Sequence, residues 1–435
     1  MESVWMDHVV MPRFESLRGD ARTDVLVIGG GMAGVLCTCL LRRAGVDCLL
    51  VEAERIAGGI TKNTTAKITA QHGLIYHKML RRFGAERTRL YLDANEVALR
   101  EYRQLCETID CDFTRRDSYV YTPDDRAALE RELLALEQLA YPAELVQTTE
   151  LPMPTAGSVR FRNQAQFHPL KFLAAISRDL PIYEHTRVTE LAPHVARTEQ
   201  GTLRAENIIV APHFPFLNKH GSYYLKLYQH RSYVLGLRGA DCVEGMYVDA
   251  SGKGLSFRSL GDLLLLGGGS HRTGKSGGGW QELEDFAKSR YPDAEVLYRW
   301  ATQDCMSLDN VPYIGHYSRQ AQDLYVATGF NKWGITSSMV AAQMLTDLMT
   351  GKENPFVEVF SPSRSILRPQ LAVNGAEAVI HLLTPTKKRC PHMGCALKWN
   401  PQERSWDCPC HGSRFEADGK IIDNPATGDL KKERD

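Results

Sequence analysis

The chain has 435 residues, and its 52 basic and 52 acidic side chains leave a formal net charge of zero. This length allows two or three domains around a large buried core. The zero net charge gives no electrostatic case for nucleic acid or an anionic membrane as a partner. The sequence shows no signal peptide and no run of the roughly 18 apolar residues that a transmembrane helix needs, so we expect a cytoplasmic protein.

Residues 24–52 are predicted to form a strand, a glycine turn, a helix and a second strand. The first run, TDVLVIG, is apolar and rich in β-branched residues, as a buried parallel strand requires. The turn Gly29-Gly-Gly31-Met-Ala-Gly34 has G-x-G-x-x-G spacing, and Glu52 ends the second strand, where it can accept ribose hydroxyls. This context predicts a dinucleotide whose pyrophosphate lies at the helix N-terminus, against the alternative of a glycine turn without nucleotide.

The middle of the chain alternates between helical and strand-like segments. Long amphipathic helices are predicted near 85–107 and 124–139, and short apolar runs between 158 and 266 predict strands. The run LYVATG predicts a strand that leads through a glycine turn into a helix from Gly334. After Arg368 the composition shifts to Cys, His, Pro and Trp, which indicates a small separate module.

That module contains two similar strings of cysteine and histidine. They are Cys390-Pro-His392-Met-Gly-Cys395 and Cys408-Pro-Cys410-His411-Gly-Ser413, and they hold four of the chain's 11 cysteines. In a reducing compartment such a cluster favours metal ligation over a disulfide scaffold. Two thiolates and two imidazoles suit zinc, but zinc fingers usually separate a cysteine pair from a histidine pair. One cysteine and one histidine from each loop suits a [2Fe–2S] centre, with zinc as the alternative.

The two strings resemble the Rieske proteins of respiratory cytochrome complexes. This resemblance implies a [2Fe–2S] cluster with four protein ligands. The implied ligands are Cys390, His392, Cys408 and His411. It also implies a disulfide between Cys395 and Cys410, the alternative being two free thiols.

Three further features follow from the resemblance to Rieske proteins. Ser413 is implied to donate its hydroxyl to a cluster sulfur, whereas Phe415 replaces the tyrosine that gives a second such bond. One donor fewer predicts a lower potential within the Rieske range of about −150 to +300 mV. The run Asp423-Asn-Pro425-Ala resembles the loop that covers the cluster. Few residues between 368 and 390 could form supporting strands, so we expect a reduced module that leans on the main body.

Residues 21–355 resemble the D-amino-acid-oxidase, glycine-oxidase and sarcosine-oxidase superfamily of flavoenzymes. Besides the G-x-G-x-x-G turn, the resemblance rests on Gly58-Gly-Ile-Thr61, on the turn from Gly329 to Thr336, and on a block from Asp304 to Gly315. Further strings resemble a bacterial subfamily with a C-terminal Rieske domain. The implied cofactor is FAD. The implied FAD-binding residues are Gly29, Gly31, Met32, Ala33, Gly34, Glu52, Arg55, Gly59, Ile60, Thr61, Gly329, Gly334, Ile335 and Thr336.

The substrate-binding residues are less clearly marked. Flavin oxidation of an amine is hydride transfer from a C–H bond beside nitrogen, and it needs a neutral amine and exclusion of water. The predicted catalytic residues are Lys67, His72, Tyr233, Arg258 and Lys332. Arg231, His271 and Arg272 are further candidates, each with a structural alternative. Thr336 stands where sarcosine enzymes place a lysine, so the usual carboxylate clamp is not expected. Covalent flavin through Cys305 or at Asn63 is not expected either.

The predicted fold class is α/β, with a Rossmann-like FAD domain, a mixed-sheet substrate domain and a small all-β Rieske module. The predicted segments are an N-terminal extension (1–20), an FAD part (about 21–78, 185–215 and 310–355), a substrate part (about 79–184 and 216–309), and a linker with the Rieske module (361–435). The predicted function is oxidation of an amine or amino acid, with electrons passed through the cluster to an external acceptor. The alternatives are a reductase that runs in the opposite direction and a non-catalytic redox sensor.

Overall fold

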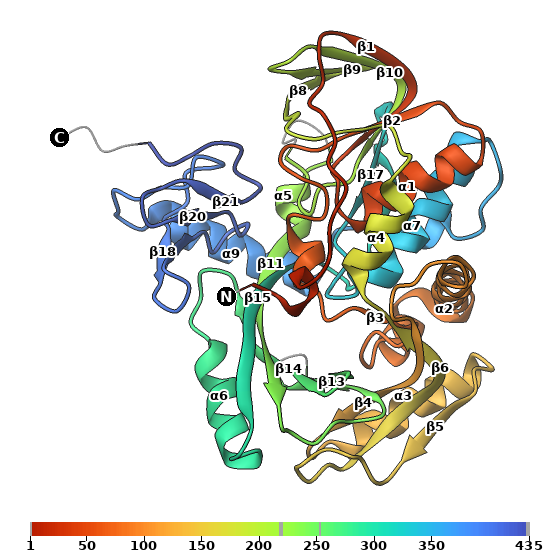
Figure 1. The fold of residues 1–435 in the computed structure, drawn as a ribbon, viewed down its shortest axis with the longest axis vertical. Helices are drawn as coiled ribbons and strands as arrows, with labels where there is room; N and C mark the ends of the chain where they lie inside the picture. The colour runs from red at the N-terminus through yellow and green to blue at the C-terminus, as the bar shows by residue number, and fades with distance from the viewer. Residues whose placement is uncertain (1, 217–220, 252–253, 432–435) are drawn as a thin grey trace.

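A computed structural model describes residues 2–216, 221–251 and 254–431. Three sheets organise the described chain, and Figure 1 shows the C-terminal module beside the two larger layers. The α/β class with a small all-β module is confirmed. Residue 1 and residues 432–435, at the ends of the first and last predicted segments, lie outside the described residues.

The first sheet holds the predicted nucleotide turn. Its order is β16 (Tyr313–Ser318), β17 (Ala321–Thr328), β10 (Thr202–Val210), β1 (Ala21–Ile28), β2 (Cys48–Val51) and β7 (Ile182–Tyr183). All neighbours are parallel except β16 with β17, and a hairpin of β8 (Val188–Ala192) and β9 (Val195–Thr198) continues from β10. The central strands are buried, as apolar β-branched strands between helical layers should be. Helices α1 (Met32–Arg43) and α7 (Gly334–Met349) pack together on this sheet.

The second, nine-stranded sheet forms the rest of the main body. Its order is β15 (Glu295–Ser307), β11 (Leu227–Arg238), β14 (Leu263–Arg272), β13 (Ser256–Leu260), β12 (Met246–Asp249), β4 (Thr114–Thr122), β6 (Gly157–Gln166) and β3 (Lys67–Ile68), with β5 (Ala143–Val146) on β6. The helices beside it are α2 (Tyr76–Cys106), α3 (Arg126–Gln138) and α6 (Gly279–Arg290). Side chains alternate between the two faces along a strand such as β11. Ser232 and Val234 therefore face the first sheet, whereas Arg231 and Tyr233 face the other side.

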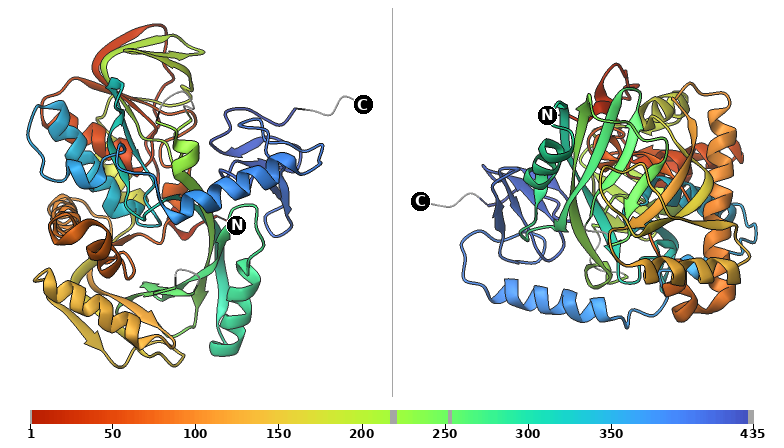
Figure 2. Two further views of the ribbon diagram at one scale, coloured as in Figure 1. Left: turned by 180° about the vertical axis from the view of Figure 1, so that it is seen from behind. Right: turned by 90° about the horizontal axis from the view of Figure 1, so that it is seen from below.

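The C-terminal module is a four-stranded antiparallel sheet preceded by a helix. The helix is α9 (Pro369–Leu383), and the strands are β18 (Lys398–Asn400), β19 (Ser405–Asp407), β20 (Arg414–Glu416) and β21 (Ile421–Asp423). Leu397, Phe415 and Ala426 form its small core together with the four cysteines of the two loops. Such a core is small for an independent domain, and the module lies against the end of β11 and β15 (Figures 1 and 2).

The structure differs from the predicted segments at several points. β3, expected in the FAD part, pairs with β6 in the second sheet. Conversely, α4 (Pro169–Ser177) packs near α1, and β7 pairs with β2, although both were expected in the substrate part. α2 consists of two helices that meet at Gly84, whose φ of +79° is not helical, so the helix expected from near 85 is present and a shorter helix from Tyr76 precedes it. α9 fills the linker, where no helix was predicted.

Candidate functional site

The glycine turn after β1 leaves room only for hydrogen at two positions. Gly29 has φ +111°, and a Cβ there would lie 3.0 Å from the backbone of Ala211. A Cβ at Gly34 would lie 1.8 Å from the carbonyl oxygen of Gly29. The backbone at the N-terminus of α1 is therefore open to a phosphate, as a dinucleotide requires. Glu52 accepts hydrogen bonds from the amides of Gly30 (2.6 Å) and Glu54 (2.9 Å), and burial raises the pKa of its carboxyl group.

The segment after β2 is held by three hydrogen bonds, of which one connects it to the start of α1. Thr61, in the 3₁₀ helix η2 (Ile60–Asn63), accepts a hydrogen bond from the amide of Met32 (3.1 Å). Trp5, in the 3₁₀ helix η1 (Val4–Met6), donates its indole N–H to the carbonyl of Thr64 (2.6 Å), and Trp300 donates to that of Asn63 (2.9 Å). Sequence reasoning missed the role of Trp5, which lies in the expected N-terminal extension. A lone aromatic residue near the terminus was its only signal.

The turn before α7 is bound to β15. Gly329, Asn331 and Lys332 all have positive φ angles, an uncommon conformation for the two non-glycine residues. Asn331 holds the turn in place, because its amide N–H donates to the carbonyl of Cys305 (3.0 Å) and its side-chain oxygen accepts from the amide of Ser307 (2.8 Å). The Thr336 hydroxyl donates to the carbonyl of Thr69 (3.0 Å), and this bond ties α7 to the segment after β3.

A polar group lies where this turn meets the second sheet. The ammonium group of Lys332 donates to the hydroxyl of Ser270 (3.2 Å), which lies 3.0 Å from the hydroxyl of Ser232. Burial raises the pKa of Asp304 on β15 to about 6, and the positive charge of Lys332 opposes this shift. Burial also lowers the pKa of Lys332. Of this group, sequence reasoning selected only Lys332 as catalytic, because the serines carry no distinctive motif.

Lys67 and Arg258 form a second group beside the 62–66 segment. Arg258 is almost completely buried, and it donates to the carbonyls of Thr65 (2.6 Å) and Ala66 (3.0 Å). Its guanidinium carbon lies 5.2 Å from the centre of the Trp5 ring. Burial, and then the neighbouring charge of Arg258, lowers the pKa of Lys67 to about 7. Lys67 is therefore able to exchange a proton near neutral pH.

His72 has a structural environment. One ring nitrogen lies 2.6 Å from the Tyr91 hydroxyl, and the other lies 2.8 Å from the carbonyl of Thr69. The ring stacks on Trp333 with 4.9 Å between centroids, and burial lowers its pKa to about 3. Both nitrogens are engaged and the ring is neutral, so these contacts support a positioning role for His72. Its predicted catalytic role stays a prediction.

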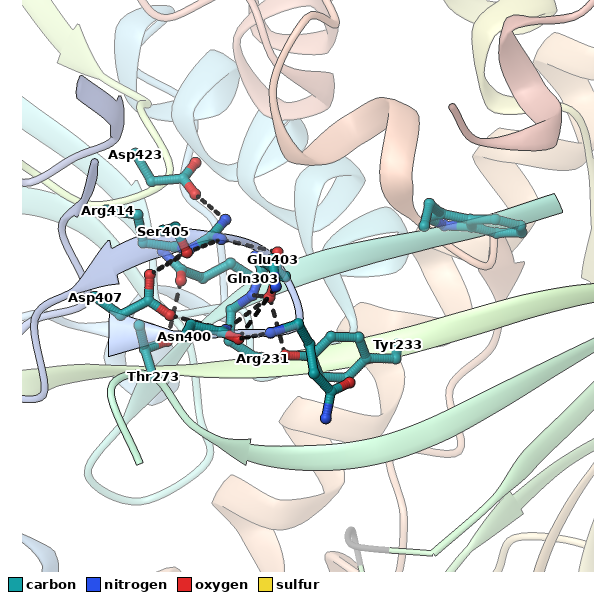
Figure 3. A network of polar contacts seen from close by, with 12 residues as sticks. Arg231, Tyr233, Thr273, Gln303, Asn400, Glu403, Ser405, Asp407, Arg414 and Asp423 are labelled. Atoms are coloured by element: carbon teal, nitrogen blue, oxygen red, sulfur yellow. Dashed lines mark hydrogen bonds and ion pairs between the residues drawn. The ribbon is translucent and has the colours of Figure 1, made fainter. Parts of the chain in front are cut away.

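Tyr233, Arg231 and Arg272 contact the C-terminal module instead of the polar group around Lys332. The Tyr233 hydroxyl donates to Glu403 (2.9 Å), and the guanidinium of Arg231 pairs with the same carboxylate (Nε–Oε1 3.0 Å; Figure 3). Arg272 donates to the carbonyls of Pro409 (3.1 Å) and Cys410 (3.2 Å). The structure thus places the predicted catalytic residue Tyr233 at the module interface, because it lies on the opposite face of β11 from Ser232.

Figure 3 shows the buried charge network at this interface. Glu403 lies between Arg231 and Arg414, and Arg414 also pairs with Asp407 (3.0 Å) and Asp423 (3.2 Å). The two arginines hold the pKa of Glu403 below its usual value in spite of burial. Buried charges of this kind are stable only when they are paired, so the network fixes the module in one orientation.

The two cysteine–histidine loops have matching backbone turns. In the first loop the amide of Cys390 donates to the carbonyl of Cys395, and the amide of Gly394 donates to that of Cys390 (both 2.9 Å). In the second loop the amides of Cys408 and Gly412 donate in the same way to the carbonyls of Ser413 and Cys408 (both 2.9 Å). A disulfide joins Cys395 and Cys410. The sulfur atoms of these two cysteines and of Cys408 lie within 4.8 Å of one another. Because the disulfide occupies two of the three sulfurs, Cys408 is the member of this group that is left as a ligand, and the full predicted set stays a prediction.

The predicted ligands have the chemistry that a [2Fe–2S] cluster needs. The rings of His392 and His411 lie 5.0 Å apart and perpendicular. The Nε2 atom of His411 lies 3.0 Å from the carbonyl of Tyr224 in α5 (Tyr223–Lys226), whereas its Nδ1 atom is buried without a hydrogen-bond partner. The Nδ1 atom is therefore open to iron. The pKa of Cys390 is lowered to about 7 in spite of burial. The main cause is contact with the Cys408 thiol, and the Ser413 hydroxyl makes a smaller contribution.

The loop over the cluster site connects the module to the first domain. The Ser413 hydroxyl accepts a hydrogen bond from the amide of Ala426 (2.9 Å), and the side chain of Asn424 donates to the carbonyl of Phe214 (2.7 Å). The Asn424–Pro425 peptide is cis. Phe214 follows β10, and its ring centroid lies 6.2 Å from that of His411. The second loop therefore faces the main body.

Comparison with known proteins defines the class of protein that these sites belong to. Residues 24–348 match the family of FAD dependent oxidoreductases, and residues 370–433 match the Rieske [2Fe-2S] domain. The chain therefore belongs to the FAD-dependent oxidoreductase family and has a Rieske domain at its C-terminal end. It is an enzyme that binds FAD and a [2Fe–2S] cluster.

Several particular proteins resemble this chain. A Bacillus subtilis (strain 168) protein named YhfW and described as a Rieske 2Fe-2S iron-sulfur protein is 33% identical over 99% of this chain and 97% of its own length. Glycine oxidase from Geobacillus kaustophilus has a TM-score of 0.66 at 21% identity, covering 79% of this chain and 99% of its own. L-proline dehydrogenase from P. horikoshii has the same TM-score at 15% identity, with 80% and 98% covered. These two structures show a shared fold.

The helices of the described residues include none that is long and apolar enough to cross a membrane.

Proposed function

We propose that this protein is a dehydrogenase that oxidises a C–N bond of an amine or amino acid and passes the electrons through its Rieske cluster to an external acceptor. One observation carries the proposal: the second cluster loop is bonded to β11 and β15. The opposite face of these strands carries the polar group around Lys332.

The contacts between the cluster loop and the flavin-side turn are short and continuous. Gln229 on β11 donates to the carbonyl of His411 (2.7 Å) and lies opposite Cys305 on β15. The carbonyl of Cys305 in turn accepts from the amide of Asn331 (3.0 Å), in the turn that precedes α7. Two hydrogen bonds and one pair of strands thus separate a cluster ligand from the turn implied to contact flavin. This continuous series of contacts supports internal electron transfer.

FAD supplies a hydride acceptor, and a Rieske cluster carries single electrons. The side chains of this protein have to bind the substrate, remove its ammonium proton and exclude water. Lys67, with a pKa of about 7, is suited to accept that proton. Lys332 supplies a positive charge beside the serine hydroxyls, which suits a substrate carboxylate. Asp304 limits that charge, because it lies close enough for the two groups to shift each other's pKa.

An anaerobic screen tests the proposed direction. The oxidised protein is mixed with single amines and amino acids while flavin absorbance and the electron paramagnetic resonance of the cluster are recorded. The expected result is flavin bleaching by one substrate class, followed by the signal of the reduced cluster. Flavin reoxidation by oxygen at a full oxidase rate, with peroxide released and no cluster signal, would contradict the proposal.

One observation favours the reverse direction, in which the cluster reduces flavin for a reductase reaction. Phe415 is completely buried and offers no hydroxyl to the cluster, which favours a low cluster potential. The midpoint potentials of flavin and cluster, measured on one sample, distinguish the two directions. A cluster potential above that of the flavin supports the dehydrogenase, and the opposite order supports the reductase.

A further inference from the structure

Helix α9 has its polar face turned inward. Asn374 accepts a hydrogen bond from Arg272 (2.9 Å), and Glu377 forms an ion pair with Lys275 (2.7 Å). The carbonyl of His381 accepts from the amide of Ala396, directly after the first cluster loop (2.9 Å). Asn374 and His381 are buried, at 7% and 4% exposure. The helix is thus held by polar contacts, whereas a helix on a globular protein usually buries an apolar face.

The outer face of α9 is apolar. Exposed aliphatic side chains recur at the three- and four-residue spacing of one helical face. They are Val373 (50% exposed), Val379 (56%), Ile380 (56%) and Leu383 (76%), with the exposed Ala372 and Ala376 between them. Leu367 (78%), Leu382 (43%) and Met393 (40%) extend the same apolar surface at the two ends. In the right view of Figure 2, α9 runs along the outer edge of the molecule. A continuous exposed apolar face of this kind marks an interaction surface.

Exposed basic residues lie at the C-terminal end of this apolar face. Residues 364–398 contain six basic side chains and one acidic side chain, Glu377, which is paired with Lys275. Two of the six, Arg364 and Arg368, face the buried carboxylate of Asp309. Of the basic residues, Lys387, Arg389 and Lys398 are exposed near the C-terminal end of the helix. The zero net charge of the whole chain conceals this local excess. The net charge alone gave no reason to expect binding to an anionic membrane, but these basic residues would be attracted to one.

We propose that α9 and the adjoining first cluster loop bind the surface of a lipid bilayer with anionic headgroups. An aliphatic face with basic residues at its end is the composition of helices that lie in the membrane interface. A second copy of the chain fits less well, because a two-fold interface uses the same patch on both copies, and this patch offers no unpaired acidic residue to face its basic end. A protein partner also fits less well, because Leu and Val are under-represented at the energetic centres of protein interfaces.

The geometry also determines what the bilayer would meet. Arg389 donates to the carbonyl of Gly394 in the first loop (2.7 Å) and to that of Thr384 after α9 (3.0 Å), so loop and helix end form one surface. Met393, beside His392, lies on that surface. The second loop, with His411, faces β11 instead. The first loop of the cluster therefore lies at the membrane, and the second lies toward the flavin domain.

Vesicle flotation of the full-length protein loaded with both cofactors tests this inference. The probes are vesicles of phosphatidylcholine alone and vesicles of equal parts phosphatidylcholine and phosphatidylglycerol. We expect the protein to float with the anionic vesicles, and we expect the floating fraction to decrease as the salt concentration rises. Val379→Ser with Leu383→Ser should reduce partitioning at least tenfold, whereas Leu134→Ser, at an exposed position on α3 (64% exposed), should not change it. Lys387→Gln should reduce partitioning into the anionic vesicles about fivefold. Lys352→Gln, at an exposed position after α7, should leave partitioning unchanged.

Two results would overturn the inference. One is failure to float with anionic vesicles while the flavin and cluster absorbance show an intact protein. The other is a dimer in sedimentation equilibrium that Leu383→Ser dissolves, which would assign the face to a second copy. Because none of these measurements depends on turnover, the inference stands or falls independently of the proposed dehydrogenase activity.

Discussion

Glu403 in the Rieske module and Arg231 on β11 form a buried ion pair across the domain interface, with side chains 9% and 3% exposed. The same carboxylate accepts a hydrogen bond from the hydroxyl of Tyr233 and forms an ion pair with Arg414. Two cations and one hydroxyl thus converge on one carboxylate of the module. The Rieske domain is therefore docked on the substrate sheet in a defined position.

Neutralising this carboxylate should detach the module. Glu403→Gln leaves Arg231 without its counter-ion in a buried site, which costs about 3 kcal/mol for pairs of this kind. We expect a lower denaturant midpoint for loss of cluster absorbance and faster proteolysis between 361 and 368. Glu358→Gln is the matched control, because Glu358 and Arg87 form an exposed pair (67% and 48%) whose loss should cost less than about 1 kcal/mol. Equal behaviour of the two variants would argue against a docked module.

Gln229 should affect the rate of internal electron transfer. Its side-chain amide donates to the carbonyls of His411 (2.7 Å) and Asn424 (3.1 Å). Gln229→Glu keeps the shape and removes both donors, so the second loop should move away from β11. Rapid-mixing spectroscopy with the reducing substrate should show unchanged flavin bleaching and at least tenfold slower cluster reduction. Gln322→Glu, at an exposed position, should leave both phases unchanged. An unchanged cluster phase in Gln229→Glu would remove this contact from the electron route.

The Ser413 hydroxyl should raise the cluster potential. It lies close enough to Cys390 to lower the pKa of that thiol, and a donor at a cluster sulfur favours the reduced, more negative state. A hydrogen bond of about 1 kcal/mol corresponds to about 40 mV for one electron. We expect Ser413→Ala to shift the midpoint downward by about this amount in a spectroelectrochemical titration, with the cluster content unchanged. A shift upward would show that the hydroxyl does not donate to the cluster.

The cofactor sites could be predicted from sequence because their chemistry is local. Six consecutive residues carry the glycine turn, and each cluster loop contains its own predicted ligands and its own half of the disulfide. The module interface could not be predicted, because Glu403 meets Arg231 only after a chain separation of 172 residues. The position of Tyr233 at this interface could not be predicted either, because alternation along β11 does not show which face meets the flavin domain. Trp5 and α9 were missed because their partners, the carbonyl of Thr64 and the side chain of Arg272, lie far away in sequence.

Lys67 should make substrate oxidation depend on pH near neutrality. Burial and the charge of Arg258 lower its pKa to about 7, so the amine is mostly protonated below pH 7 and mostly neutral above it. If it accepts the substrate proton, the rate of flavin reduction should rise as the pH increases through about 7. Lys67→Arg keeps a permanent positive charge, so the rise should disappear and the rate should fall at least a hundredfold. Lys62→Arg, five residues earlier on η2, should retain the wild-type profile. A purely structural lysine would instead leave the inflection in place in Lys67→Arg, with only binding or stability reduced.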